Sequence, residues 1–386
     1  MKICNIGWAN SIHVERIMSW FSRKGHDVSI ITNTLKTIDG ITVYDISRKP
    51  DLRPRIKRYK DFYFNVNSKL LNSLNEIIHI RKLVKEIKPH IVHSHSLWYP
   101  GYLGVYLNFH PFIVTVLNGD VLWKKNDISI YAKLRTRRAL KKADIVTGES
   151  QILIDACIKN GVEEGKTHVT RGWGVDLKKF NISGSKVDIR FDLGLPVDCK
   201  MVLSPRNTGW FYNLENIVKA MPRVISKISN VYFVFIWHSN DTVKENELLK
   251  LASQLGVQDK IIIIGFVNHG KVVLYHKASD VMVSVSDRDS GPMALQEAMA
   301  CGDVPVISDL SSVREWVENG WNGLLVDPND VDQIADSIIK LLENDEMRKS
   351  FSERNWKLIQ EKGDQDYWME KMEDLYYQLI SNRNKR

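Results

Sequence analysis

The chain has few cysteines and no long apolar run. Its 386 residues include four cysteines that form no Cys-x-x-Cys pair: Cys4, Cys157, Cys199 and Cys301. This spacing indicates neither a disulfide framework nor a zinc site, so we expect buried free thiols. No apolar run approaches the roughly 20 residues that a transmembrane helix requires. Met1–Ile6 predicts a strand rather than a signal peptide, so we expect a cytoplasmic protein.

A dinucleotide fingerprint is also missing. Gly7-Trp8-Ala9-Asn10-Ser11 follows the first predicted strand, and it has one glycine where the pattern Gly-x-Gly-x-x-Gly has three. A nicotinamide-dependent dehydrogenase is therefore poorly supported. The apolar fraction of 44% is typical of a globular protein, and the length allows two domains. This composition excludes a disordered or fibrous chain.

The positive charge is concentrated in the first half. The net charge is +8, but residues 1–180 carry 30 basic against 16 acidic side chains, a balance of +14, and the remainder carries 24 against 30, a balance of −6. Arg48–Lys60 is the most basic segment, and Phe62-Tyr63-Phe64 follows it. Two interpretations of this run stay open: it binds an anionic surface such as a membrane, or it is a solvated charged loop. No nucleic-acid-binding motif accompanies it, so we expect no nucleic acid partner.

Strand-like and helical patterns alternate along the chain, which predicts an α/β protein with parallel sheets covered by helices. The strand-like runs are Lys2–Trp8, Asp27–Thr32, Ile41–Ile46, His90–Ser96, Phe112–Asn118, Asp144–Glu149, His168–Trp173, Met201–Ser204, Val231–Trp237, Lys260–Phe266, Val281–Ser286, Val304–Ser308 and Gly323–Val326. Long amphipathic stretches cover Ile12–Lys24, Leu70–Lys88 and Ile130–Lys142.

The alternation restarts after a polar break at Asn181–Asp188, so we expect two doubly wound, Rossmann-like domains, residues 1–180 and 181–364. The last helix, within residues 365–386, is expected to fold back onto the first domain. Ligands of open parallel sheets bind at the carboxyl ends of the strands. Two such edges that face each other would enclose a central cleft.

The segment Ser284–Ser308 carries the strongest functional signal. Gly291-Pro292 predicts a turn, and Met293–Ala300, with Ala294 in its first turn, predicts a helix whose free N–H groups attract an anion. Asp289 precedes this turn, and Glu297 lies about one helical turn inside, where a carboxylate is costly to bury without donors. A ribose diol would supply such donors. The structural alternatives are a turn aspartate and a salt-bridged glutamate on an exposed face.

Arg206 ends the first strand of the second domain, in Ser204-Pro205-Arg206-Asn207. Its guanidinium fork can bind two phosphate oxygens and neutralise a leaving diphosphate. The alternative is an ordinary surface arginine.

These motifs together resemble the retaining glycosyltransferases of family 4, which have the GT-B fold. The resemblance rests on Asp289-x7-Glu297 followed by Ala-Met-Ala-Cys-Gly-Asp-Val-Pro-Val, on Gly265-Phe266-Val267, on Gly323-Leu-Leu-Val-Asp-Pro, and on Asn10-Ser-Ile-His13 with Gly25-His26-Asp27-Val28. It covers essentially the whole chain. It implies two Rossmann-like domains, a nucleotide-sugar donor bound by the second, an acceptor bound mainly by the first, and no metal requirement.

The resemblance also implies roles for residues of the second domain. Glu297 matches the glutamate that holds the ribose, and Asp289 matches a glutamate that faces the transferred sugar, one methylene shorter here. The family usually has a lysine a few residues after Arg206, where this chain has none until Lys219. We expect Tyr212, Asn213 or backbone amides to take its place. Gly265, Phe266 and Val267 are expected to offer backbone hydrogen bonds to the nucleobase, and Gly291, Met293 and Ala294 to bind the donor through the helix N-terminus.

Polar residues at strand ends of the first domain are candidates for acceptor binding. They are Asn10, His13, His95, Asn118, Gly119 and Asp120. Many family members have histidine where this chain has Asn118, whose amide binds a sugar hydroxyl but does not titrate near neutral pH. Isolated histidines are equally compatible with structural roles.

The function expected from these features is sugar transfer from a nucleoside diphosphate to an acceptor hydroxyl with retention of configuration. The basic first half favours a glycan or lipid-linked acceptor in surface polysaccharide or glycolipid assembly, at the inner face of a membrane. Two alternatives stay open: a non-catalytic sugar-nucleotide-binding protein, and a GT-B enzyme of another reaction, such as an epimerase or a phosphorylase. The sequence does not name the sugar, the base or the acceptor.

Overall fold

The chain folds into two compact units. The computed structural model describes residues 1–34, 36–46, 64–99, 101–123, 129–183, 187–196, 198–237 and 241–384. Unit 1 comprises Met1–Thr170 with Met369–Arg386, and unit 2 comprises Arg171–Trp368. The boundary lies at Thr170 rather than at residue 180, because Val175 and Phe180 are buried in a hydrophobic cluster of unit 2. The basic run Arg48–Lys60 and the aromatic residues Phe62-Tyr63 lie outside the described residues.

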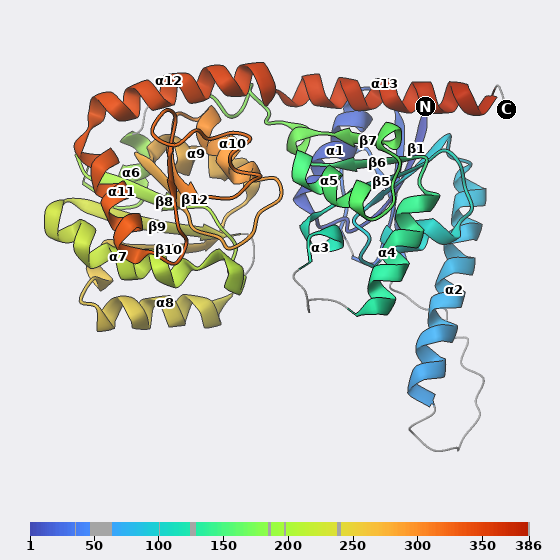
Figure 1. Cartoon of the computed structure of the whole chain (residues 1–386), viewed down its shortest axis with the longest axis horizontal. Helices are drawn as coiled ribbons and strands as arrows, with labels where there is room; N and C mark the ends of the chain where they lie inside the picture. The colour runs from blue at the N-terminus through green and yellow to red at the C-terminus, as the bar shows by residue number, and fades with distance from the viewer. Residues whose placement is uncertain are drawn as a thin grey trace. The chain divides into compact units, whose positions relative to one another are not determined.

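Unit 1 is built on a parallel sheet whose strand order is β3-β2-β1-β4-β5-β6-β7 within the described residues (Figure 1). All neighbouring strands pair in parallel. The bounds are Lys2–Ile6 for β1, Asp27–Thr32 for β2, Thr42–Asp45 for β3, Ile91–His95 for β4, Phe112–Val116 for β5, Ile145–Gly148 for β6 and Thr167–Val169 for β7. The order reverses direction between β1 and β4.

Helices cover both faces of this sheet. They are α1 (Ile12–Arg23), α2 (Phe64–Ile87), α3 (Asn118–Val121), α4 (Ile130–Lys142), α5 (Gln151–Lys159) and α13 (Gln365–Asn384). One apolar cluster joins α2, α4 and α5 to β4, β5 and β6. No described helix combines the length and the apolar character that crossing a membrane requires.

The last helix, α13, contributes to the core of unit 1. Tyr376 is fully buried, its ring stacks on Phe21 of α1 at 5.0 Å, and its hydroxyl contacts Nδ1 of His93 in β4. At the rim of this contact, Nε2 of His26 lies 2.6 Å from the carboxylate of Glu373. Met369–Arg386 therefore belongs to unit 1 although it follows the whole of unit 2 in the sequence.

Unit 2 contains a second parallel sheet, in the order β10-β9-β8-β11-β12-β13 within the described residues. The bounds are Lys200–Ser204 for β8, Val231–Trp237 for β9, Ile261–Phe266 for β10, Val281–Ser284 for β11, Val304–Ser308 for β12 and Leu324–Val326 for β13. Here the order reverses between β8 and β11, so that the loops after these two strands diverge at the carboxyl edge.

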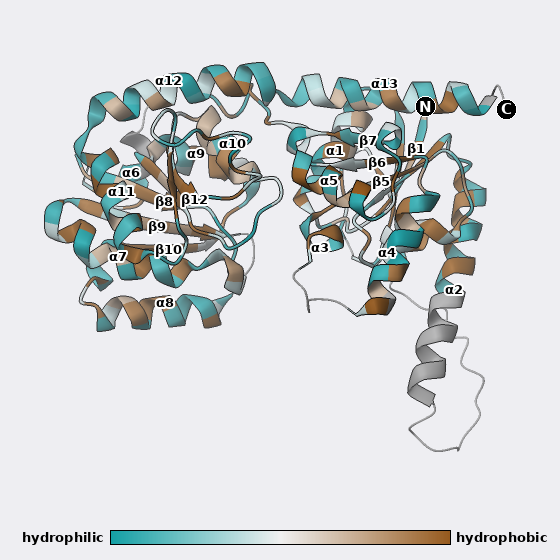
Figure 2. Ribbon diagram, in the orientation of Figure 1, coloured by the Kyte–Doolittle hydropathy of each residue, from teal (hydrophilic) through white to brown (hydrophobic). Residues whose placement is uncertain are grey.

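The helices of unit 2 also lie on both faces of its sheet (Figure 1). Helices α7 (Leu214–Lys227), α8 (Thr242–Gln254) and α11 (Val331–Glu343) share one apolar cluster with the strands. Helices α9 (His269–Ala278), α10 (Met293–Ala300) and α12 (Asp345–Lys362) contribute to other clusters, and α6 (Val187–Asp192) is hydrogen-bonded to the end of α9 through Arg190. Figure 2 shows hydrophobic strands inside and hydrophilic outer helix surfaces.

The sequence patterns located the strands and the long helices. The predicted bounds are confirmed to the residue for Asp27–Thr32, Val231–Trp237, Val304–Ser308 and the helix Ile130–Lys142, and most others shift by one or two residues. The prediction of a strand over His168–Trp173 is wrong in its second half. Arg171, Gly172 and Trp173 form a 3₁₀ turn with φ values of 48°, 69° and 66°, a left-handed conformation that a strand excludes.

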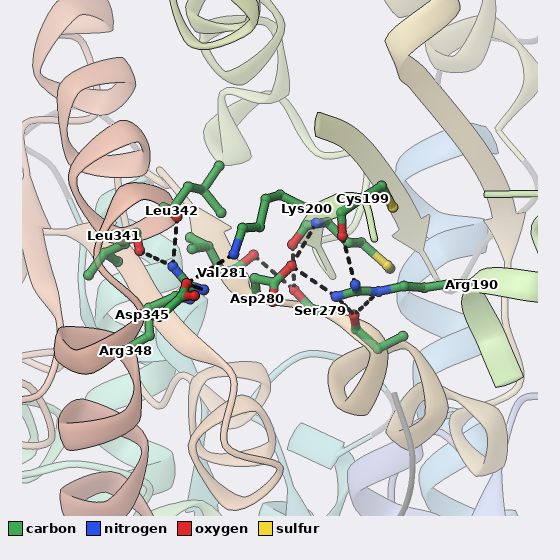
Figure 3. A network of polar contacts seen from close by, with 12 residues as sticks. Arg190, Cys199, Lys200, Ser279, Asp280, Val281, Leu341, Leu342, Asp345 and Arg348 are labelled. Carbon is green, nitrogen blue, oxygen red and sulfur yellow. Dashed lines mark hydrogen bonds and ion pairs between the residues drawn. The ribbon is translucent and has the colours of Figure 1, made fainter. Parts of the chain in front are cut away.

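A buried polar network anchors unit 2 at the amino ends of β8 and β11, the edge opposite to the strand-end loops (Figure 3). Arg190 of α6 binds the Asp280 carboxylate at 2.9 Å and donates to the carbonyls of Ala278 and Cys199. The same carboxylate oxygen of Asp280 accepts the N–H of Met201 at 2.9 Å. Both charged side chains are less than a tenth exposed. The network therefore fixes α6 and α9 to the start of the sheet.

Removing one partner of this pair should destabilise unit 2 strongly. Arg190→Met leaves the Asp280 carboxylate buried without its charge partner, so we expect a loss of about 3–5 kcal/mol in the free energy of unfolding, measured by chemical denaturation. The exposed arginine variant Arg223→Met is the control and should leave the stability nearly unchanged. Equal, small losses in both variants would contradict a structural role of the buried pair.

Candidate functional site

Two charged side chains meet where the strand order of unit 2 reverses. Arg206 follows β8, and Asp289 lies in the loop after β11. Nη2 of Arg206 lies 2.6 Å from Oδ2 of Asp289, and each side chain is only about a tenth exposed, at 10% and 12%. The reversal point of a doubly wound sheet is where ligands bind, so this ion pair stands at the expected position.

The surroundings of Arg206 keep it charged and leave it one unsatisfied donor. Burial disfavours its charged form, but Asp289 and Tyr212 outweigh this effect and raise the pKa of Arg206 above its ordinary value. The guanidinium carbon lies 4.6 Å from the centre of the Tyr212 ring. The Nε–H has no acceptor among the described residues, although Arg206 is buried. A buried cationic donor without an acceptor is suited to an anionic ligand.

The loop after β11 turns directly into α10. Oδ1 of Asp289 accepts the N–H of Gly291 at 3.3 Å, and the Ser312 hydroxyl donates to the Asp289 carbonyl at 2.6 Å. Helix α10 begins at Met293 after Pro292, which provides no side-chain cap. The N–H groups of Leu295 and Gln296 bond to the Pro292 carbonyl. Met293 and Ala294 thus form the first turn, as the sequence predicted, with their N–H groups directed out of the helix start.

Glu297 is buried, and it has a partner that the sequence did not reveal. Its Oε1 lies 2.7 Å from Nε2 of His269, the first residue of α9, and Glu297 is 5% exposed. The ring of His269 lies 5.4 Å from that of Phe180. The structural alternative of a glutamate on an exposed face is therefore wrong. The histidine contact orients the carboxylate at the carboxyl edge of the sheet.

The end of β10 forms a tight turn beside this pair. Gly265 has a φ of 69°, which a residue with a side chain rarely adopts, and the chain then exposes Phe266 and buries Val267. The N–H of Val267 donates to the Trp237 carbonyl at 3.0 Å. That N–H is therefore used within the protein, while the exposed Phe266 ring is available to a ligand.

An aromatic turn, Trp210–Tyr212, replaces the lysine-containing loop expected from the resemblance. Arg206 lies against Tyr212, and the guanidinium carbon of Arg288 lies 5.0 Å from the Trp210 ring and 5.8 Å from the Phe211 ring. Both arginines thus contact the same turn. The sequence reasoning overlooked Arg288, the neighbour of Asp289.

Asn213 does not fit the role expected for it. Its Nδ2 donates to the Val285 carbonyl at 3.0 Å and to Oδ1 of Asp287 at 2.9 Å. Both amide hydrogens are therefore used, and the remaining oxygen would repel a phosphate. Asn213, at a φ of 51°, joins the start of α7 to the loop after β11.

In unit 1, polar side chains gather where its own strand order reverses, between β1 and β4. Nδ1 of His95 lies 2.5 Å from Nδ2 of Asn5, and the His95 ring stacks on His93 at 4.2 Å. His13, at the start of α1, lies 3.7 Å from the buried carboxylate of Glu149, which follows β6. Glu149 was not among the predicted site residues. Asn10 is exposed in the turn before α1.

Burial determines the charge of these histidines. Desolvation, and then the nearby His13, lower the pKa of His95 to about 3, and burial lowers the pKa of His93 as well. His95 is therefore a neutral ring at physiological pH. It is able to bind a hydroxyl but not to act as an imidazolium acid.

Asp120 connects the loops that follow β4 and β5. Its carboxylate accepts from the Ser96 hydroxyl, the Leu97 N–H and the Leu117 N–H, and it is 2% exposed. Burial raises the pKa of Asp120 to about 6. Asp120 also lines a pocket of unit 1, so the expectation that it contacts an acceptor stays a prediction. Its neighbours Asn118 and Gly119 are half-buried and exposed, respectively.

All four cysteines are buried and free, as predicted. Within the described part of the chain, no three His, Cys, Asp or Glu side chains are arranged to hold a metal ion.

The family models match nearly the whole chain. Residues 11–178 match the model described as Glycosyltransferase Family 4, and residues 185–357 match the model described as Glycosyl transferases group 1.

Similar proteins include glycosyltransferases of distant organisms. An uncharacterised glycosyltransferase of Methanocaldococcus jannaschii is 24% identical over 89% of each chain. The alpha-monoglucosyldiacylglycerol synthase of Streptococcus pneumoniae is 23% identical over 78% of this chain and 67% of its own length. The Anabaena protein HepE, solved with UDP-glucose, matches in fold with a TM-score of 0.79 at 17% identity, over 98% of this chain and 100% of its own.

The depressed pKa of His95 predicts a steeper loss of stability in acid. A histidine whose pKa is lower in the folded state supports folding above its unfolded value near 6.5 and loses that support as the pH falls. Between pH 6 and pH 5, the unfolding free energy of the wild type should therefore fall by about 1.2 kcal/mol more than that of His95→Gln. Denaturant titrations at several pH values measure both slopes, and parallel profiles would contradict the burial of a neutral His95.

Proposed function

Because the chain belongs to the family-4 glycosyltransferases, we propose that it transfers a sugar from a nucleoside diphosphate donor to an acceptor hydroxyl with retention of anomeric configuration. Unit 2 binds the donor and unit 1 binds the acceptor. The observation that carries this proposal is the buried Arg206–Asp289 pair at the strand-order reversal, next to the start of α10.

The diphosphate binds to Arg206 and to the start of α10. The unsatisfied Nε–H of Arg206 and the first-turn N–H groups of α10 are donors that suit phosphate oxygens. Arg288, which contacts the same aromatic turn as Arg206, supplies a second cation in place of the family's lysine. In this proposal the protein's own charges, rather than a metal ion or cofactor, stabilise the leaving group.

Glu297 holds the ribose of the donor. Its contact with His269 fixes the carboxylate in a buried position, and two ribose hydroxyls would be natural donors to it. His269 is then a positioning residue, since it acts through Glu297. The exposed ring of Phe266 stands at the end of β10, where a nucleobase can stack.

The transfer follows a front-face substitution. The bond from the anomeric carbon to the diphosphate oxygen breaks, the bond to the acceptor oxygen forms on the same face, and the acceptor proton passes to the departing diphosphate. Arg206 and the α10 start offset the charge that develops on the diphosphate. Asp289, held by Arg206, places a negative charge near the developing oxocarbenium ion.

The acceptor is a glycan or a lipid-linked molecule, and the chain acts in surface polysaccharide or glycolipid assembly. Support comes from the excess of basic residues in the first half and from the streptococcal relative, whose name describes a glycolipid synthase. We further propose that the chain works in the cytoplasm, at the inner face of a membrane.

Substitutions at different site residues should have different effects on donor affinity and on turnover. A matching nucleoside diphosphate sugar should raise the melting temperature of the wild type, because it binds the folded form. Arg206→Ala should weaken donor affinity roughly 10–100-fold, since a charge-assisted bond worth about 1.5–3 kcal/mol is lost, and Glu297→Gln should weaken it as well. Asp289→Asn should keep donor affinity but lower kcat by about 10²–10³. Calorimetry with UDP-, GDP-, ADP- and CMP-sugars and a transfer assay measure these effects.

A charge-matched control separates binding from folding. Arg206→Ala alone leaves Asp289 unpaired, whereas Arg206→Ala with Asp289→Asn removes both charges and should recover stability but not donor affinity. Normal donor affinity in this double variant would overturn the site. Donor binding without transfer or hydrolysis would instead indicate a binding protein, and an inverted product in NMR spectra would exclude retention.

Neutralising the basic run should weaken membrane binding. Each basic residue near an anionic surface contributes about 1 kcal/mol, so changing Arg53, Arg55, Lys57 and Arg58 to Gln should reduce binding to phosphatidylglycerol vesicles by about 10²–10³. Sedimentation with vesicles measures the bound fraction. The matched control changes four exposed residues of unit 2, Arg223, Lys227, Lys250 and Lys340, and should bind like the wild type. Unchanged binding after the first set of changes would refute the membrane proposal.

A further inference from the structure

Unit 1 contains a pocket with two tryptophans in its wall. The pocket has a volume of about 230 Å³ and lies at the carboxyl ends of β4 and β5, beside the start of α4. Its lining includes Trp98, Trp123, Arg135, Ser129 and Thr136, all of them in unit 1. Figure 1 shows α3 and α4, the helices that follow β5, on this side of the unit.

Hydrogen bonds connect the two loops that form part of the wall of this pocket. Asp120 binds the loop after β4 through Ser96 and Leu97, and the loop after β5 through Leu117. Ser96 is buried with a φ of 68°, a costly conformation for a residue with a side chain, and its hydroxyl accepts the N–H of Trp98 at 3.1 Å. The strained loop and the buried carboxylate together position Trp98.

The two indoles are placed against the backbone of Gly119. The Trp123 Nε1–H donates to the Gly119 carbonyl at 3.1 Å, and a Cβ on Gly119 would lie 3.3 Å from Nε1 of Trp98. Trp98 is nevertheless 49% exposed. An exposed indole face in the wall of a pocket is available to stack against the ring of a ligand.

The chemistry of the lining suits a sugar ring. Indole faces pack against the apolar C–H face of a pyranose, while Arg135, Ser129 and Thr136 offer polar groups for its hydroxyls. The volume lies below the roughly 300–1,000 Å³ of sites for drug-sized ligands, so the pocket suits one ring rather than a nucleotide or a lipid chain.

From these observations we infer that the Trp98–Trp123 pocket binds a pyranose ring of the acceptor, so that the acceptor is itself a saccharide or carries one. This inference rests on the proposed function, since it specifies the acceptor. It extends that function because it assigns a saccharide subsite to Trp98 and Trp123.

Fluorine NMR of the full chain labelled with 5-fluorotryptophan tests the inference. Trp98→Phe and Trp123→Phe identify the two resonances and preserve an aromatic ring at each position. Methyl glucopyranoside, methyl galactopyranoside and methyl N-acetylglucosaminide are the probes, with glycerol and uridine as controls. We expect at least one pyranoside to shift both resonances saturably while Trp321 stays unchanged. Trp321 is a matched control, 42% exposed, with Arg354 5.2 Å from its ring, and it belongs to unit 2.

Transfer kinetics provide the second measurement. With a saccharide acceptor, Trp98→Ala should raise the acceptor KM about tenfold, the change expected for a lost stacking contact of about 1.4 kcal/mol, and leave the donor KM unchanged. Trp321→Ala should behave like the wild type. Donor binding without any pyranoside response, or an equal response to glycerol or uridine, would overturn the inference alone. A pyranoside response without any donor binding would instead overturn the proposed function.

Discussion

The ion pair of Arg206 and Asp289 joins the two strands between which the sheet of unit 2 reverses its order. A buried arginine is tolerated only with a counter-charge, and a buried aspartate only with donors. The pair satisfies both conditions, and it connects the loop after β8 with the loop after β11 at the carboxyl edge of the sheet. Its position explains why the loop after β11, the aromatic turn at Trp210–Tyr212 and the start of α10 lie together.

In unit 1 the buried titratable groups near the strand-order reversal are neutral histidines rather than an ion pair. His93 and His95 are buried residues of β4, where His93 contacts Tyr376 of α13 and His95 contacts Asn5 of β1, and desolvation keeps both rings neutral. Neutral imidazoles and Asn5 form hydrogen bonds in the interior of unit 1 without a buried charge. The Asp120 carboxylate, in contrast, accepts hydrogen bonds from two loops and thereby positions the Trp98–Trp123 pocket.

Much of the fold could be predicted because its signals are local. Apolar runs such as Val231–Trp237 and the helix formers of Met293–Ala300 predict their elements without knowledge of the tertiary structure, and these elements are confirmed. Arg206 could be proposed as a site residue because it follows a predicted strand, and Asp289 because it precedes the turn into a predicted helix. The partners His269, Arg288 and Glu149 escaped prediction, although His269 directly follows the Gly265–Asn268 turn and Glu149 ends a predicted strand.

The sequence by itself determined the α/β class, the two sheets, the helix at Met293 and the family to which the chain belongs, because these depend on periodicity and on short motifs. Only the tertiary structure decided which side chains meet: Arg206 with Asp289 across 83 positions, His269 with Glu297 across 28, and Asn213 with Asp287 across 74. The physical reason is that such contacts depend on strand order and loop direction. Hydrophobic periodicity fixes which face of a strand is buried but not which strand lies beside it.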